Sequence, residues 1–242
     1  MRFEVPIDAW SARIGGRRTC EAIRDWLEHP VDPGPRIAPE SIPGVSAMAL
    51  RRTSGLGRAA IAIGRELLGR VPAGEPLSVI TVSELGELGT NDVLIESVVA
   101  GETLSPQRFS ASVHNHVLGQ LCTTLDLPLP GGASTGAASG LEIGMVEALG
   151  ELAGGRRVLF LAFEPEVDEH YAPWLGGRAP EHMVAVLLSP DAPVRVLLER
   201  SGGPPPDPVP ASPTPWPGCP PVEGRTTQLA GPDGWRWSHV AA

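Results

Sequence analysis

Long apolar runs, stretches of basic residues and paired cysteines are all missing from this 242-residue sequence. No apolar run approaches the ~20 residues that span a bilayer. The first residues, MRFEVPIDAW, lack the basic stretch and apolar core of a signal peptide. We therefore expect a cytoplasmic protein without membrane insertion. The formal net charge of −9 also argues against nucleic acid or an anionic membrane as the main partner.

Metal-ligand patterns are missing as well. The three cysteines, Cys20, Cys122 and Cys219, form no C-x-x-C pair, so neither a zinc site nor a disulfide scaffold is indicated. His114 and His116 stand two residues apart, which places them on different faces of a helix rather than around one ion. We expect no metal site and no cofactor.

One acidic stretch, residues 163–171, could in principle hold a divalent cation because it follows an apolar run that resembles a strand. Acidic loops are more often simply solvated, and Pro165 interrupts any regular ligand geometry. We therefore interpret this stretch as a solvated loop.

The sequence does contain alternating helix-type and strand-type patterns, which predict a layered α/β domain with a mixed sheet. We expect helices over residues 19–28, 46–70, 91–101, 105–122 and 141–152. We expect strands over residues 1–10, 77–83, 156–163, 182–189 and 194–199, the last two forming a hairpin.

The composition changes near residue 200, which suggests a boundary between a domain at 1–200 and a proline-rich extension at 201–242. Trp235 and Trp237 near the end stand two residues apart, a strand-like spacing that could dock the extension on the body.

A serine-hydrolase interpretation starts from residues 132–136, which read G-x-S-x-G ahead of a helix and would make Ser134 the nucleophile. Asp168 and either His170 or His182 follow in the order of an α/β-hydrolase triad. The motif is short, however, and prolines stand where a central strand should end. This interpretation stays open as the less favoured alternative.

Three stretches together resemble the N-terminal half of the β-ketoacyl synthases, which have a thiolase-like fold. They are LSPQRFSASVHNHVLG at 104–119, STGAASGLEIG at 134–144 and RRVLFLAF at 156–163. The first is similar to the S-P-x-x-F-S-x-S-V-H-N signature of chain-length-factor-like proteins from aryl polyene gene clusters. Its matching positions include Ser105, Pro106, His114 and Asn115.

The resemblance has one chemical departure. In the synthases a T-A-C-x-S-G turn carries the nucleophilic cysteine at a helix N-terminus. Here Thr135, Ser139 and Gly140 match that turn, but Ala137 stands at the cysteine position. A thiolate at a helix N-terminus has a lowered pKa and nearby N–H groups to bind an oxyanion. A methyl group cannot be acylated, so we expect no catalytic activity from the chain alone.

The resemblance therefore implies a thiolase-like half-fold that acts through a partner. We expect a heterodimer with a full-length, cysteine-bearing β-ketoacyl synthase, which brings an acyl carrier protein to the complex. We also expect the chain to lack the C-terminal half from which synthases take their decarboxylating histidines.

By analogy with the synthase dimers, the 105–122 helix would present four side chains to the partner's acyl tunnel: Arg108, Phe109, Ser112 and His116. They would limit chain length in polyene, polyketide or fatty-acid-type elongation. An acyl-binding or carrier-protein-binding module without a synthase partner remains a third interpretation.

Overall fold

The computed structural model describes residues 1–29, 34, 36–51, 53–127, 131–135, 140–175, 180–200, 228–230 and 235–239. Within these ranges an eight-stranded mixed sheet runs in the order β3-β2-β4-β5-β1-β6-β8-β7. The strands are β1 (Arg2–Ile14), β2 (Leu77–Val82), β3 (Gly131–Ser134), β4 (Arg157–Glu164), β5 (His182–Leu188), β6 (Val194–Arg200), β7 (Gln228–Ala230) and β8 (Trp235–His239). The helices are α1 (Cys20–Glu28), α2 (Ala47–Arg51), α3 (Gly55–Leu68), α4 (Leu88–Val99), α5 (Pro106–Ser110), α6 (His116–Leu125) and α7 (Gly140–Ala153).

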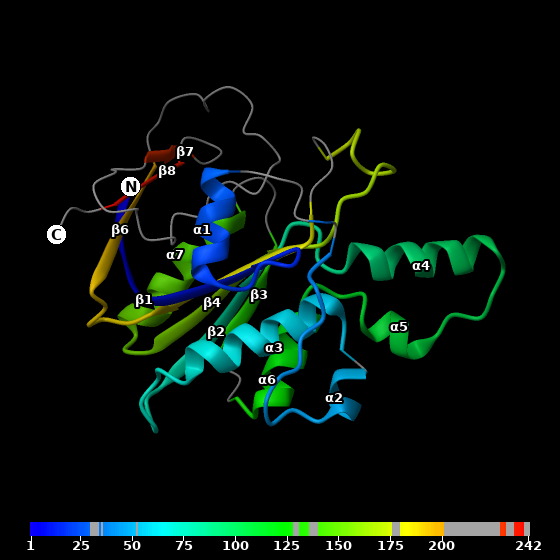
Figure 1. Ribbon diagram of the computed structural model, residues 1–242, viewed down its shortest axis with the longest axis horizontal. Coiled ribbons are helices and arrows are strands. Elements are labelled where there is room, and N and C mark those ends of the chain that lie inside the picture. The colour runs from blue at the N-terminus through cyan, green and yellow to red at the C-terminus, as the bar shows by residue number, and fades with distance from the viewer. Residues whose placement is uncertain are drawn as a thin grey trace.

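Helices cover both faces of the sheet, which confirms the predicted α/β layers (Figure 1). On one face α3 and α6 bury Ile61, Ile63 and Leu121 against β2, β4 and β5. On the other face α7 buries Met145 and Ala148 against Ile80 and Phe160. None of the described helices is long and apolar enough to cross a membrane.

The β2–β3–β4 part of the sheet is parallel, and the remaining described pairs are antiparallel. Parallel pairing brings the carboxyl ends of β2, β3 and β4 to one edge of the sheet. That edge is where a site is expected in a fold of this kind.

The predicted hairpin between β5 and β6 is wrong, because β1 lies between these two strands. Its second half pairs with β5 and its first half with β6, both antiparallel. The register shifts between Ile7 and Ala9. This irregularity keeps Val5 and Ile7 on the same face as Trp10 further along.

Two predicted helices are broken in the structure. The 46–70 helix divides into α2 and α3, because the Ser54 hydroxyl caps a new helix by accepting from the Gly57 N–H at 3.0 Å. Met48 lies on α2 and is 73% exposed. The other helix, 105–122, divides into α5 and α6, a change that matters for the site.

The remaining element boundaries differ less. The first strand continues to Ile14 instead of ending near residue 10, and α4 begins at Leu88, three residues before the predicted start. The short strand β3 was not predicted.

The strand-like spacing of Trp235 and Trp237 is confirmed by β8, which pairs with β6. Both indoles are buried, and Trp237 Nε1 donates to Glu142 Oε1 at 3.1 Å. Glu142 belongs to the first turn of α7. The last described strand is therefore hydrogen-bonded to the first turn of α7, which begins within the motif at 134–144.

Candidate functional site

The turn between β3 and α7 holds the position that the synthase resemblance assigns to the nucleophile. Ala137 and Ser139 lie outside the described residues, whereas Thr135 is exposed before the turn and Gly140 is buried at the start of α7. A Cβ atom at Gly144, one turn further on, would overlap the Val82 side chain. This close approach fixes α7 against β2 directly behind the turn.

Ser134 has a carboxylate partner rather than a histidine. Its Oγ donates to Glu147 Oε2 of α7 at 2.5 Å. His182 is on β5, three strands away from β3 in the sheet, or roughly 14 Å at about 4.8 Å per strand. In addition, His182 Nδ1 lies 3.0 Å from the Pro180 carbonyl oxygen. The structure therefore does not bring Ser134 and His182, one of the two histidines expected as the base, together.

The segment that carries the family signature forms two helices and a turn instead of one helix. Ser105 and Pro106 start α5 as expected, with Ser105 Oγ accepting from the Arg108 N–H at 3.4 Å. The Ser110 and Ser112 hydroxyls donate to the Gln107 and Phe109 carbonyls at 2.9 and 2.8 Å. Such local bonds compete with helix propagation, which explains why α5 ends at Ser110.

The break separates the four residues expected to face an acyl tunnel. Arg108 and Phe109 are exposed on α5, Ser112 lies in the turn, and His116 begins α6. Burial lowers the pKa of His116, which favours its neutral form. The four side chains therefore do not share one helix face.

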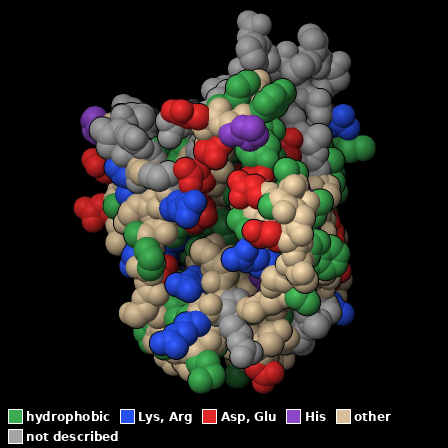
Figure 2. Space-filling view, turned by 90° about the vertical axis from the view of Figure 1, so that its right-hand side faces the viewer, with side chains coloured by type: hydrophobic (Ala, Val, Ile, Leu, Met, Phe, Trp, Pro, Cys, Tyr) green, Lys and Arg blue, Asp and Glu red, His purple; other side chains and the backbone are tan. Residues whose placement is uncertain are grey.

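Helices α4 and α5 and their connection, residues 88–110, project from the body (Figure 1). We call this segment the arm. Of α4 only Leu94 is buried. The arm exposes several large apolar side chains: Val93, Ile95, Val98, Val99, Leu104 and Phe109. From the side of the arm, hydrophobic and acidic side chains lie next to each other on the surface (Figure 2). Within the described residues, the arm thus holds more than half of the large exposed apolar side chains.

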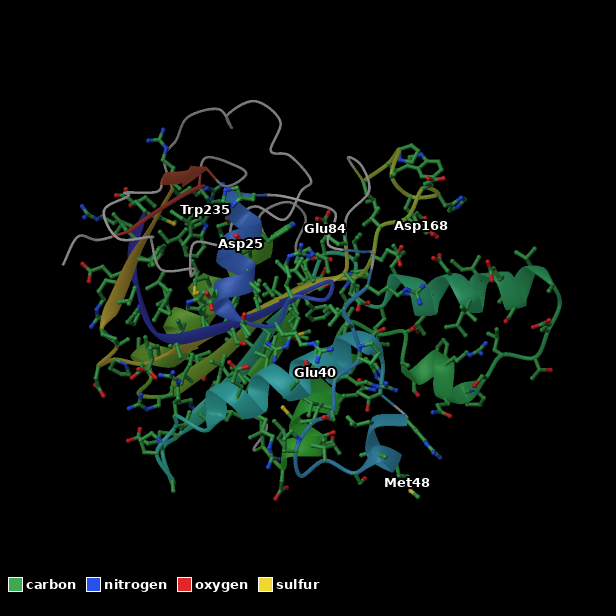
Figure 3. All side chains as sticks on the ribbon, in the orientation of Figure 1. Asp25, Glu40, Met48, Glu84, Asp168 and Trp235 are labelled. Atoms are coloured by element: carbon green, nitrogen blue, oxygen red, sulfur yellow. The ribbon has the colours of Figure 1, made fainter. Side chains whose placement is uncertain are left out.

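The arm leaves the body at residues 83–87, which follow β2 and which we call the hinge turn. The Glu164 carboxylate at the end of β4 accepts three hydrogen bonds from it. The donors are Ser83 Oγ at 3.1 Å, the Glu84 N–H at 2.7 Å and the Leu85 N–H at 3.0 Å. Burial, more than any other cause, raises the pKa of Glu164 to about 7. Figure 3 labels Glu84 in this region, between the body and the arm.

His114 contacts the other side of the hinge turn. Its Nε2 lies 3.3 Å from the Glu84 carbonyl oxygen. Gly86 has φ +58°, and a Cβ atom there would lie 3.1 Å from the imidazole ring. Glycine therefore satisfies both the backbone conformation and the space at this position. His114, which the resemblance includes in a signature, has a visible structural role here.

A second carboxylate closes the hinge turn. Glu87 is buried and accepts from Ser54 Oγ at 2.7 Å and from Thr90 Oγ1 at 3.4 Å. Burial raises its pKa. Sequence reasoning missed Glu87 and interpreted Glu164 as part of a solvated loop. The one available signal for Glu164 was its place directly after the apolar run of β4.

The described part of the chain has no group of three or more His, Cys, Asp or Glu side chains that could hold a metal ion. Tyr171 hydrogen-bonds to Asp92 of α4, which joins the acidic loop after β4 to the arm. The loop thus has a contact within the fold.

Sequence comparison identifies one family. The description "Beta-ketoacyl synthase, N-terminal domain" matches residues 24–207, which is most of the chain. Comparison with curated proteins gives no match.

Solved structures share the fold. The chain is similar, with a TM-score of 0.78 and 24% identity, to a chain in the structure of a ketosynthase (ApeO) in complex with its chain length factor (ApeC) from Xenorhabdus doucetiae. That match covers 99% of this chain and 100% of the other. The ishigamide ketosynthase/chain length factor has a TM-score of 0.58 at 16% identity, covering 78% of this chain and 62% of that one.

A type II polyketide synthase acyl-carrier protein in complex with its ketosynthase, AntDE:AntF, gives a TM-score of 0.56 at 12% identity. This match covers 84% of this chain and 71% of that one. Structural matches at these identities show the fold, whereas the sequence match over residues 24–207 shows the family. The chain belongs to the beta-ketoacyl synthase family, through its N-terminal domain.

Proposed function

We infer that this chain is a non-catalytic, chain-length-factor-like subunit that pairs with a cysteine-bearing β-ketoacyl synthase. The observation that carries the proposal is Ala137 at the position where the family has its nucleophile. The similarity over its whole length to a chain of a ketosynthase–chain length factor complex supports the same proposal. The partner supplies the thiolate, and this chain contributes a wall of the acyl tunnel.

Two neighbouring surfaces support a partner. Strand β3 stands at the end of the sheet, where no described strand pairs with its outer side. The Ser83 N–H donates to the Ser134 carbonyl at 3.3 Å, so the carboxyl end of β3 lies beside the hinge turn. A synthase that docks along β3 can therefore also reach the exposed apolar side chains of the arm.

The arm is the part that would measure the acyl chain. Phe109 is 64% exposed on α5 next to Arg108, whereas Ser112 and His116 lie just beyond the arm. A side chain that moves a tunnel wall discriminates between acyl lengths by ~1–3 kcal/mol per methylene. We assign Phe109 the largest effect, because the Ser112 hydroxyl is already bonded to the Phe109 carbonyl and His116 is half-buried.

The decisive experiment is co-expression of the full chain with a cysteine-bearing synthase encoded beside it. A stable heterodimer is expected, together with no covalent acylation of this chain by acyl-carrier donors. Acylation of the lone polypeptide would overturn the proposal. Purification of both proteins as separate species would favour an acyl-binding or carrier-binding module instead.

Substitutions at Phe109 test the tunnel assignment within that complex. Phe109→Ala should lengthen the product and Phe109→Trp should shorten it, as measured by mass spectrometry of the released chains. Met48→Ala is the matched control, since Met48 is also exposed, at 73%, but lies on α2 outside the arm. Product lengths that respond equally to Met48→Ala would remove Phe109 from the tunnel wall.

A further inference from the structure

Glu164 differs from the other charged residues because its carboxylate alone accepts three hydrogen bonds from the hinge turn. Its Oε1 accepts from the Glu84 N–H, and its Oε2 accepts from the Leu85 N–H and from Ser83 Oγ. Ser83 Oγ in turn accepts from the Gly86 N–H at 2.7 Å. Hydrogen bonds to a carboxylate are stronger than bonds between neutral groups. The conformation of the hinge turn thus depends on this carboxylate.

Both ends of the arm return to the hinge turn. The arm begins directly after Glu87, and the residues that follow it include His114, which contacts Glu84 and Gly86. The Asn91 side-chain amide also donates to the Ser112 carbonyl at 3.4 Å. Only Leu94 of α4 is buried, so core packing contributes little to the direction in which the arm points.

We propose that Glu164 is a positioning residue for acyl-chain length, acting through the hinge turn and His114 on the placement of the arm. The proposal rests on the proposed function, since the arm is the part assigned to the tunnel. It concerns a residue that lies outside the family signature and outside the four tunnel candidates.

A small rotation at the base of the arm produces a large displacement at its far end, which is why Glu164 should affect the acyl-chain length. The twelve residues of α4 extend ~18 Å at 1.5 Å per residue, so a change of ~10° at the hinge turn moves the far end by ~3 Å. Displacements of ~1 Å in reacting complexes already have large effects on rate. A loosened hinge turn would therefore change which acyl chain fits, even though Glu164 never contacts that chain.

The first experiment uses the full chain without a partner, at pH 8, where the Glu164 carboxylate is charged. Glu164→Gln turns one acceptor oxygen into a donor, so at least one hydrogen bond from the hinge turn is lost. Amide hydrogen exchange should become about tenfold faster, or more, in peptides covering residues 83–87 and 111–116.

A matched control comes from the opposite end of β2. Glu151 of α7 also accepts from a serine of β2, with Ser78 Oγ at 2.6 Å. Glu151→Gln should leave exchange at residues 83–87 and 111–116 unchanged. If Glu164→Gln leaves these two segments as protected as in the unsubstituted chain, the positioning role is overturned whether or not a synthase partner exists.

The second experiment measures product lengths in the complex with the synthase. Glu164→Gln should broaden or shift the length distribution while total turnover and the affinity between the subunits stay within about threefold. Gly86→Ala should shift it too, because a methyl group there would press on the His114 ring. An unchanged distribution in both variants, with faster exchange at the hinge turn, would overturn the role in chain length.

The two proposals fail in different ways. Absence of any complex with a synthase, combined with faster exchange in Glu164→Gln, would overturn the proposed function and the role in chain length but leave the anchoring of the turn intact. Formation of the complex with unchanged exchange would overturn only the inference about Glu164.

Discussion

The body of this protein buries its apolar side chains, whereas the arm exposes most of them. Helix α3 buries eight of its fourteen residues against the sheet, whereas α4 buries one of twelve. Both helices are rich in aliphatic side chains. The difference shows that α3 is packed into the body, whereas the arm leaves most of its apolar side chains exposed.

Truncating one phenylalanine in each region should give the largest difference in stability between the body and the arm. Phe160 is fully buried in β4, whereas Phe109 is 64% exposed. Phe160→Ala should lower the free energy of unfolding by about 3–5 kcal/mol, and Phe109→Ala should change it by less than about 0.5 kcal/mol. Urea denaturation of the isolated chain measures both. A loss above ~2 kcal/mol for Phe109→Ala would mean that the arm is packed without a partner.

The junction between the two regions should respond to pH through Glu164. Its raised pKa, about 7, means that the folded state binds this proton more tightly than the unfolded chain does. Stability from this group is therefore highest at low pH and falls as the pH rises from about 4.5 to about 7.

Unfolding free energies of the protein and of Glu164→Gln, measured between pH 4 and 8, test this expectation. The free energy of unfolding of the protein minus that of Glu164→Gln should fall by up to about 3 kcal/mol as the pH rises. Subtracting the variant removes the contributions of Glu87, His116 and the other titrating groups. A difference that stays flat would show that Glu164 is not perturbed.

Substitutions at two glycines of α7 test how closely this helix packs on β2 in the body. Gly144→Ala should destabilise the fold by about 1–3 kcal/mol, because the added methyl group overlaps Val82. Gly150→Ala on the same helix meets nothing within 4 Å and should stabilise it by about 0.5–1 kcal/mol. Thermal denaturation distinguishes the two signs. Equal effects would contradict the close approach of α7 to β2.

Removing a helix cap in the body and one in the arm should give the smallest difference in stability between the two regions. Ser54 caps α3 in the body and also donates to buried Glu87, so Ser54→Ala should cost about 1–2 kcal/mol. Ser105 caps the exposed five-residue helix α5 with a longer hydrogen bond. Ser105→Ala should lower the stability by no more than about 0.5 kcal/mol. Chemical denaturation curves with a similar loss for both variants would mean that the arm folds together with the body.

Sequence patterns predicted the elements whose signals are local. The strands β2 and β4 follow from their apolar runs, and the predicted helix over 19–28 matches α1. The 105–122 helix failed because hydroxyls of Ser110 and Ser112 compete for backbone carbonyls, an effect that apolar periodicity does not report. The β5–β6 hairpin failed because β1, almost the whole chain away, takes the place between them.

The candidate site divides in the same manner. The assignment of Ala137 to the nucleophile position stays a prediction, which rests on a contiguous sequence motif. Glu164 could not be recognised from the sequence, since two of its three partners are backbone N–H groups, which have no sequence signature. The role of His114 was also hidden, because it depends on the space beside Gly86.

The position of β1 has a consequence for biosynthesis. Arg2 pairs with Glu199 and Ile14 with His182, so β1 finds its neighbours only after more than 160 further residues have been synthesised. Contacts between residues far apart in sequence slow folding, and apolar segments stay exposed until these contacts form. During synthesis, β1 therefore stays without both of its neighbours until β5 and β6 have been made.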